Sequence, residues 1–142
     1  MPRPPLRLLV VTPEETKVDQ EADMVVLRAS TGCMGVMPGH EARTAVLNIG
    51  VVRILREGAE QRLAVYGGLA IIRGGALTIL TGGADWPGDI DLAQAEIDRE
   101  HAERRLRERQ DDLEIQSDQA RLRRALVQIE VSAYAVAEET QA

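Results

Sequence analysis

The side chains that could do acid–base, nucleophilic or metal chemistry are few and lie apart in the sequence. His40 stands behind Pro38 and Gly39 and before Glu41, yet no Ser, Cys or paired carboxylate accompanies it. A catalytic base needs such a partner within hydrogen-bond reach. Cys33 is the only cysteine, which excludes a disulfide framework and a cluster of soft metal ligands. We therefore predict that the chain is not itself an enzyme, that it has no metal site, and that His40 and Glu41 belong to a loop or an interface.

Paired glycines are the next feature that could bind a ligand, because glycine-rich loops can cradle phosphates. The pairs occur at Gly67-Gly68, Gly74-Gly75 and Gly82-Gly83. No Gly-x-x-x-x-Gly-Lys-Ser/Thr pattern surrounds them, and none of them opens a helical segment. We interpret these pairs, together with Glu57-Gly58, as the turns of β-hairpins.

The distribution of glycine and proline divides the chain into two parts. All 12 glycines and all 6 prolines lie within residues 1–88, whereas residues 89–142 contain neither. Both residue types punctuate strands and break helices. The sequence therefore predicts an α+β protein, with an N-terminal antiparallel β-sandwich over residues 1–88 and a C-terminal helical hairpin over residues 89–142.

The first part contains short apolar segments at close spacing, which is typical of antiparallel hairpins. These segments cover residues 6–12, 24–29, 51–55, 63–66, 69–72 and 77–80. Their Val, Leu, Ile and Ala side chains, with no Phe in the chain, suit two closely packed sheets rather than a ligand cavity.

The second part begins with a helix-start signal, in which Asp91 can cap a helix and Gln94 follows three residues later. We predict a first helix over residues 92–110, a bend over 111–117, and a second helix capped by Ser117. Apolar residues spaced three and four apart predict one narrow seam between the helices. The predicted seam contains Leu92, Ala95, Ala102, Leu106, Leu113, Leu122, Ala125, Leu126, Ile129, Ala133 and Val136. Such a seam buries little area, so we expect the hairpin to open at small cost.

The charge balance excludes several classes of partner. The formal net charge is −6, with nine basic and nine acidic residues in 1–88 but eight basic and 14 acidic residues in 89–142. Because only 2% of the residues are aromatic and no basic stripe occurs, we expect no binding to nucleic acid. No apolar run approaches the roughly 18 residues of a membrane span, so we expect no direct membrane insertion.

Several segments, taken in order from Leu6 to Val136, resemble one protein family. They are Leu-Leu-Val-Val-Thr-Pro-Glu at 8–14, Gly-Val-Met-Pro-Gly-His-Glu at 35–41, Asn-Ile-Gly-Val-Val-Arg-Ile at 48–54, Tyr-Gly-Gly at 66–68, Leu-Thr-Ile-Leu at 77–80 and Ala-Glu-Arg-Arg-Leu at 102–106. Each motif is weak by itself, and their joint order and spacing carry the resemblance. The chain is similar to the epsilon subunit of bacterial F-type ATP synthases.

The resemblance implies a non-catalytic subunit of a rotary, proton-transporting complex, with a ten-stranded β-sandwich that docks on the gamma subunit and on the c-subunit ring. Residues 89–142 would form a regulatory arm that can extend along gamma to the catalytic alpha and beta subunits and restrain ATP hydrolysis. The implied location is peripheral, on the cytoplasmic face of the bacterial plasma membrane. The candidate interface residues are Gly35, Pro38, Gly39, His40, Glu41, Arg121, Arg123 and Arg124.

Some members of that family bind ATP through an Ile-Asp-x-x-Arg-Ala motif and further arginines on both helices. Here Gln94 replaces the arginine of the motif, and His101 and Gln128 stand where other arginines are expected. Asp91 and Arg124 remain as a remnant of the site. Losing three cations should cost several kcal/mol if each charge-assisted contact contributes about 1.5–3 kcal/mol. We therefore expect no cofactor, and weak or absent ATP binding.

Other interpretations stay open from the residues alone. Asp91 and Gln94 can form an ordinary helix cap, and the arginines at 121, 123 and 124 can be a solvated helix face. A free-standing adaptor that joins two proteins, or an ATP-sensing switch, would also use a sandwich and a helical hairpin. The ordered segments favour the ATP synthase subunit over the adaptor, and the missing arginines argue against the ATP-sensing switch.

Overall fold

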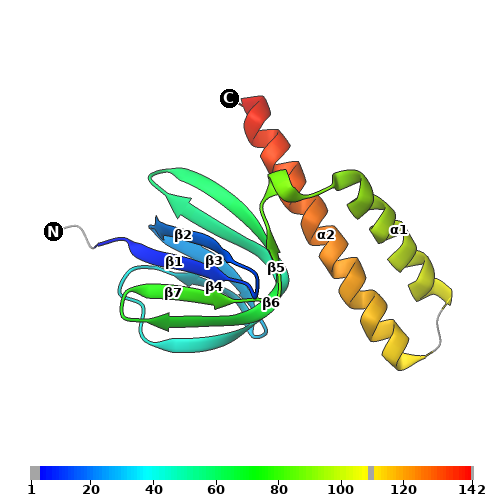
Figure 1. The fold of residues 1–142 in the computed structure, drawn as a ribbon, viewed down its shortest axis with the longest axis horizontal. Helices are drawn as coiled ribbons and strands as arrows, with labels where there is room; N and C mark the ends of the chain where they lie inside the picture. Colours follow the sequence, from blue (N-terminus) through cyan, green and yellow to red (C-terminus); the bar gives the residue numbers. More distant parts are fainter. Residues whose placement is uncertain (1–3, 109–110, 142) are drawn as a thin grey trace.

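The structure is a computed structural model that describes residues 4–108 and 111–141, with side chains described as far as residue 135. Its strands are β1 (Leu6–Val11), β2 (Thr16–Ala22), β3 (Met24–Ala29), β4 (Gly32–Val36), β5 (Arg43–Arg56), β6 (Ala59–Arg73), β7 (Ala76–Leu80) and β8 (Ala84–Asp85). Its helices are α1 (Leu92–Glu108) and α2 (Asp112–Gln141), which we call the arm, and the 3₁₀ turn Pro87–Asp89 leads into them. The predicted order, sandwich first and helical hairpin second, is confirmed (Figure 1).

The sandwich is one hydrogen-bonded sheet that folds over on itself, with the strand order β2-β1-β7-β6-β5-β3-β4. Strands β5 and β6 have 14 and 15 residues and pair with each other along nearly their whole length. One half of this long ribbon pairs with β7 in the first layer, and the other half pairs with β3 in the second layer. The described residues therefore form eight strands rather than the ten expected, because the two longest strands serve both layers.

Gly67 and Gly68 do not form a hairpin, which corrects one of the sequence interpretations. Strand β6 runs through both residues, and their φ angles are 84° and 132°. A side chain at Gly68 would collide with the backbone carbonyl oxygen of Leu80 on the neighbouring strand β7. The pair therefore bends the long strand where the sheet folds over and lets β7 approach closely.

The core lies between the two layers and is aliphatic, as the composition predicted. Its fully buried side chains alternate along the strands, and the largest of them include Leu6, Leu8, Val10, Val25, Leu27, Val36, Ile54, Leu63, Val65, Leu77 and Ile79. Trp86, the single tryptophan, packs against this core and is only partly buried. Not every pair is antiparallel, because β1 runs parallel to β7.

The bend of the helical hairpin is shorter than predicted. Helix α2 begins at Asp112, and the Asp111 side chain accepts a hydrogen bond of 2.9 Å from the backbone N–H of Leu113. Asp111 is therefore the cap, and the predicted bend over 111–117 with Ser117 as the cap is wrong. An aspartate is as good a cap as a serine, and the segment after it contains no helix breaker. Residues 109 and 110, at the predicted end of the first helix, lie outside the described part of the chain.

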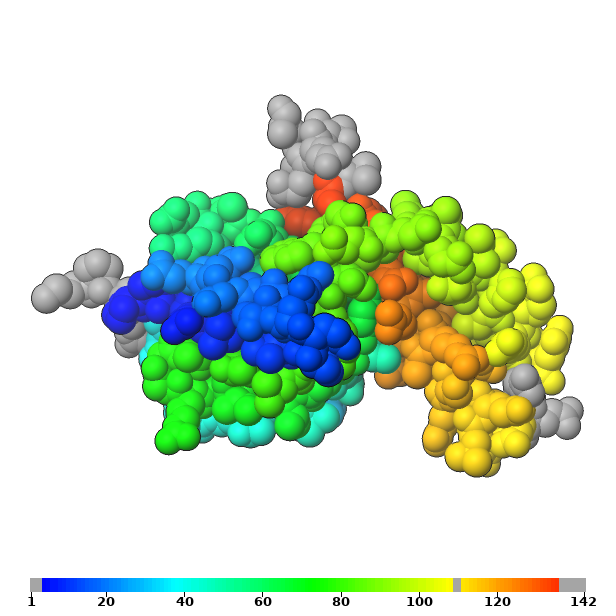
Figure 2. Space-filling view, viewed as in Figure 1, coloured from blue at the N-terminus to red at the C-terminus, as the bar shows by residue number. Residues whose placement is uncertain are grey.

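Helix α2 lies between the sandwich and α1, as the ribbon shows (Figure 1), and the space-filling view shows the arm packed against one side of the sandwich (Figure 2). This arrangement requires two apolar faces on α2, where a single seam was predicted. Ala95, Ala102 and Ala125 are buried between the two helices, as expected. Leu92, Leu113 and Leu126 are 39%, 78% and 46% exposed, and Ala133 is also exposed, so these members of the predicted seam are wrong. The side chain of Val136 lies outside the described part.

Candidate functional site

The segment that contains His40 is an exposed turn between β4 and β5. The backbone N–H of His40 donates to the carbonyl oxygen of Met37 at 3.1 Å, and Gly39 supplies the positive φ of 87° that the turn needs. His40 Nδ1 lies 2.8 Å from the carbonyl oxygen of Glu41, and Met37 is 52% exposed. Gly35 lies outside this turn, in β4. The turn therefore presents a short, ordered, partly apolar surface, with the His40 ring tied to the backbone.

A row of apolar side chains crosses the outer face of the first layer, and sequence reasoning missed it. Val11, Leu80, Leu69 and Val46 stand opposite one another on β1, β7, β6 and β5. Leu80, Leu69 and Val46 are 41%, 39% and 56% exposed, although each lies in a sheet whose other face is the core. We call these four residues the outer row. Strand alternation could have placed them on the face away from the core, but it could not say whether another element covers that face.

The inner face of α2 packs on the second layer through two valines. Val127 and Val131 are buried against Ala64 of β6, and partly buried side chains surround them. These two valines were absent from the predicted seam, because they point away from α1. The contact is apolar and small, so it contributes only a few kcal/mol to holding the arm on the sandwich.

Tyr66 on β6 forms a polar contact with the arm beside these valines. The Arg124 guanidinium lies over the Tyr66 ring, 4.0 Å from its centroid. The Tyr66 hydroxyl donates to Asp85 at 2.7 Å and accepts from the Gln128 side-chain amide at 3.0 Å. Burial, with a smaller contribution from Asp85, raises the pKa of Tyr66 to about 12. Tyr66 is therefore a neutral donor that connects α2 to β8.

Tyr134 on α2 makes the reciprocal contact. Its ring lies under the Arg62 guanidinium, 4.1 Å away, and its hydroxyl donates to the backbone carbonyl of Glu60 at 3.1 Å. The Glu60 carboxylate accepts from Arg53 at 2.6 Å and from Arg62 at 2.7 Å, and the Arg53 hydrogen bond lowers the pKa of Glu60. The chain has only two tyrosines, and both join the arm to the sandwich. We call these the two tyrosine contacts.

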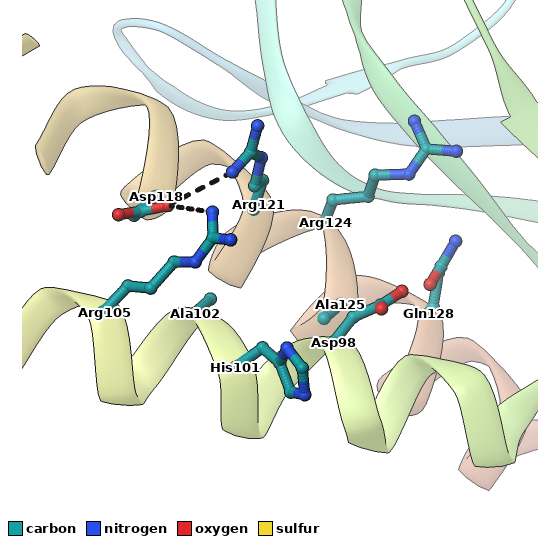
Figure 3. Close-up of a pocket in the computed structure, with 9 residues that line it drawn as sticks. All are labelled: Asp98, His101, Ala102, Arg105, Asp118, Arg121, Arg124, Ala125 and Gln128. Carbon is teal, nitrogen blue, oxygen red and sulfur yellow. Dashed lines mark hydrogen bonds and ion pairs between the residues drawn. The ribbon is translucent and has the colours of Figure 1, made fainter. Parts of the chain in front are cut away.

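A cavity of about 300 Å³ opens between α1 and α2 (Figure 3). The Asp118 side chain, only 3% exposed, lies 3.8 Å from Arg105 of α1 and 3.4 Å from Arg121 of α2. Asp98 and His101 also line the cavity. Two of the three arginines that line the cavity are thus already paired with a buried carboxylate, and the Asp118–Arg105 pair links the two helices.

Asp91, one of the two residues that remain of the implied ATP site, serves the helix itself. The Asp91 side chain accepts from the backbone N–H of Gln94 at 3.1 Å, so Asp91 caps α1 as the capping interpretation predicted. The Gln94 side chain donates to Asp98 at 2.9 Å instead of returning to the cap. Asp91 is not among the residues that line the cavity.

Known families match both parts of the chain. The β-sandwich domain model of the ATP synthase delta/epsilon chain matches residues 5–87, and the long α-helix domain model of the same chain matches residues 89–133. The chain belongs to the ATP synthase delta/epsilon family. This confirms the resemblance that the ordered segments suggested.

Curated relatives named ATP synthase epsilon chain agree with this membership over most of the length. One from Bacillus velezensis is 35% identical, over 89% of this chain and 96% of the relative. Another from Brevibacillus brevis is 42% identical, over 74% of this chain and 80% of the relative. The chain is therefore an epsilon-type subunit of an ATP synthase, and not the catalytic part of the complex.

Solved structures confirm the fold. A chain of the Euglena gracilis mitochondrial ATP synthase, OSCP/F1/c-ring in rotational state 1, matches with a TM-score of 0.74 at 23% identity, over 96% of this chain and 84% of that one. A chain of the Tetrahymena thermophila mitochondrial enzyme matches with a TM-score of 0.53 at 12% identity, over 69% and 75%. In the described residues of this epsilon-type chain, no helix has the length and apolar character to cross a membrane.

The three arginines that the sequence groups on the second helix of this epsilon-type chain have different contacts, although Arg121 and Arg124 both line the interhelical cavity (Figure 3). Arg121 pairs with Asp118 in the interhelical cavity. Arg124 lies over Tyr66 of the sandwich, and Arg123 lines a groove on another face of α2. They therefore do not form one patch while the arm lies on the sandwich.

Proposed function

We propose that this chain joins the gamma subunit to the c-subunit ring in the rotor of an ion-translocating ATP synthase, and that its arm restrains ATP hydrolysis. The observation that carries the regulatory part is the narrow contact between arm and sandwich. It consists of two buried valines and the two tyrosine contacts. The other part of the proposal is supported by family membership and by two exposed surfaces of the sandwich.

The outer row is the surface that we assign to gamma. Four apolar side chains in register on adjacent strands make a flat, continuous strip, and covering such a strip with a partner removes apolar area from water. The exposed turn 37–41 is assigned to the c-subunit ring. Its Met37 offers an apolar contact, while Pro38 and Gly39 keep the turn short and rigid.

The arm can act as a switch because each of its contacts with the sandwich is modest. A cation–π contact contributes about 0.5–2 kcal/mol, and a buried valine about 1.5–3 kcal/mol. A partner surface that offers comparable contacts to the extended arm can therefore shift the arm between two positions. Release frees Arg124 from Tyr66 and carries it, together with Arg123, toward the catalytic alpha and beta subunits, where acidic side chains would pair with both arginines.

The interhelical cavity is proposed not to be a nucleotide site. A triphosphate needs several unpaired cations. Here Arg105 and Arg121 contact Asp118, and Arg124 lies over Tyr66. Asp98 adds a second carboxylate to the lining. We accordingly propose that the interhelical cavity gives the arm no response to bound ATP.

The proposed location is peripheral, on the cytoplasmic face of a bacterial plasma membrane. It is supported by the bacterial origin of the curated relatives and by their assignment to ATP synthase. The chain would be held there by its partner subunits.

The deciding experiment measures ATP hydrolysis by the cognate catalytic head assembled with gamma. Full-length protein is compared with a chain that ends at Gly88, and with no added subunit. We expect both forms to bind gamma and only the full-length form to suppress hydrolysis. Equal hydrolysis with both bound forms would reduce the function to rotor coupling. If neither form bound gamma, the free-standing adaptor would become the better interpretation.

A further inference from the structure

A second concave surface lies where the arm meets the second layer, on a different face of α2 from the interhelical cavity. It is an open groove of about 510 Å³. Its lining residues come from β3, β4, β5, β6 and α2, and four of them are arginines. The arginines are Arg28, Arg53, Arg62 and Arg123, and Glu130 is the one acidic residue among the lining. This is a concentration of positive charge on a chain whose net charge is −6.

The four arginines are not equivalent. Arg53 and Arg62 are both held by the Glu60 carboxylate, at 2.6 and 2.7 Å. Among the side chains that the structure describes, which end at residue 135, neither Arg28 nor Arg123 makes an ion pair. The groove therefore offers two guanidinium groups whose hydrogen-bonding capacity is unused, with two further cations beside them.

The two unpaired arginines come from the two parts of the protein. Arg28 stands on β3 of the sandwich, and Arg123 stands on α2 of the arm. The stem of Arg28 lies close to Gly50 on β5, which leaves room for it, because a Cβ at Gly50 would lie only 3.1 Å from the Arg28 Cβ. The close packing of the Arg28 stem against β5 limits the directions in which its head group can point.

We propose that this groove binds a small anion with more than one phosphate charge, contacted by Arg28 from the sandwich and Arg123 from the arm. Planar guanidinium groups match the spacing of phosphate oxygens and bind them in pairs. The volume falls in the range of about 300–1,000 Å³ that small-molecule sites occupy. Since the two arginines belong to different parts, the bound anion ties the arm to the sandwich. The proposal rests on the groove alone and does not require the proposed function.

The test is the binding of inorganic pyrophosphate to the full chain, measured by calorimetry at low ionic strength, with inorganic phosphate as a second ligand. Arg28→Gln and Arg123→Gln should each weaken pyrophosphate binding by about tenfold or more, since each loses a charge-assisted contact. Arg104→Gln is the matched control, because it removes the same charge from an exposed site on α1 outside the groove. The control should change the affinity for pyrophosphate by less than about twofold, since the charge that it removes is distant from the groove and is screened by solvent and salt. Circular dichroism checks that each variant is folded.

The single cysteine reports where the anion binds. Cys33 is exposed and lines the groove, so it can be alkylated selectively. Pyrophosphate should slow alkylation of Cys33 by iodoacetate in the unaltered chain, and should have no effect in the Arg28→Gln variant.

Three results would overturn the proposal. One is equal loss of affinity in the Arg104→Gln control, which would indicate only general charge attraction. Another is pyrophosphate binding that leaves Cys33 alkylation unchanged. The third is that Arg28 and Arg123 bind a poly-glutamate peptide but do not bind pyrophosphate. That result would assign the groove to an acidic protein segment. None of these results bears on the binding of gamma.

Discussion

At the scale of single residues, polar contacts decide where the arm lies. Arg124 of the arm lies over the ring of Tyr66 in the sandwich, and Arg62 of the sandwich lies over the ring of Tyr134 in the arm. Each hydroxyl also has a partner across the interface. The geometry is therefore specific, whereas the valine contact between the same elements is not directional.

The contact of Tyr66 with the arm should weaken at alkaline pH. Its pKa is raised from 10.0 to about 12 in the folded chain, so the folded state favours the neutral phenol. The contribution of the neutral Tyr66 side chain to the stability of the folded state is fully present below pH 10 and is lost as the pH rises from 10 to about 12. In a Tyr134→Phe variant, Tyr66 is the only phenol, and its ionisation can be followed by absorbance. A midpoint at the ordinary value in the folded protein would contradict the buried contact.

At the scale of elements, α2 depends on packing against two neighbours. One face meets α1 through small alanines, and the other meets the second layer through Val127 and Val131. This division explains why α2 carries little continuous apolar sequence, because two narrow stripes share its surface with polar residues.

Shortening Val131 should loosen the arm without unfolding the sandwich. Val131 is completely buried, so Val131→Ala is expected to lower the free energy of arm opening by about 1–3 kcal/mol. Hydrogen exchange of the α2 amides measures this change, and the amides of β1 and β7 should keep their protection. Leu126→Ala is the control, because Leu126 is 46% exposed on the same helix. A similar loosening in both variants would contradict the assigned contact face.

The bend of strand β6 should tolerate no side chain. Gly68 has a φ of 132°, and a Cβ there would collide with the Leu80 carbonyl oxygen. Gly68→Ala is expected to lower the free energy of unfolding by at least about 2 kcal/mol. Gly82→Ala, where a Cβ meets nothing within 4 Å, should change it by less than about 0.5 kcal/mol. Chemical denaturation of the two variants compares these values, and equal stability would argue against a bend at Gly68.

At the scale of the whole molecule, the surface that we propose for assembly and the contact that we propose for regulation lie on different layers of the sandwich. The outer row lies on the first layer, whereas α2 covers part of the second layer. The sandwich can therefore stay bound through one layer while the arm leaves the other. A single rigid protein with one binding face could not combine these two roles.

A charge in the outer row should break assembly. Leu69 is 39% exposed and pairs with both Val46 and Leu80, so Leu69→Asp puts a carboxylate in the middle of the row. We expect at least about a tenfold loss of affinity for gamma, since an unpaired charge is costly to bury in an interface. Leu113→Asp, at a site that is 78% exposed near the start of α2, should bind gamma normally. Co-purification with gamma measures both, and normal binding by Leu69→Asp would move the gamma site elsewhere.

Much of this arrangement could be predicted from local sequence signals. The end of glycine and proline usage at Gly88 coincides with the 3₁₀ turn Pro87–Asp89 between β8 and α1. The cap at Asp91 and the alternation of core residues also follow from local rules, because capping and side-chain direction depend on near neighbours. The polar edge strand β2 was missed, because it lacks a continuous apolar segment. Its sequence is Thr-Lys-Val-Asp-Gln-Glu-Ala.

The sequence by itself determined the two-part architecture and the family, because composition, periodicity and motif order are properties of the chain. Only the tertiary structure decided that Val127 and Val131 face the sandwich and that Arg123 lines a different concave surface from Arg121 and Arg124. Helical spacing tells which side chains share a face, but the partner of that face is set by how the elements pack. For the same reason, the outer row and the arginine groove, which join residues far apart in the chain, became visible only in three dimensions.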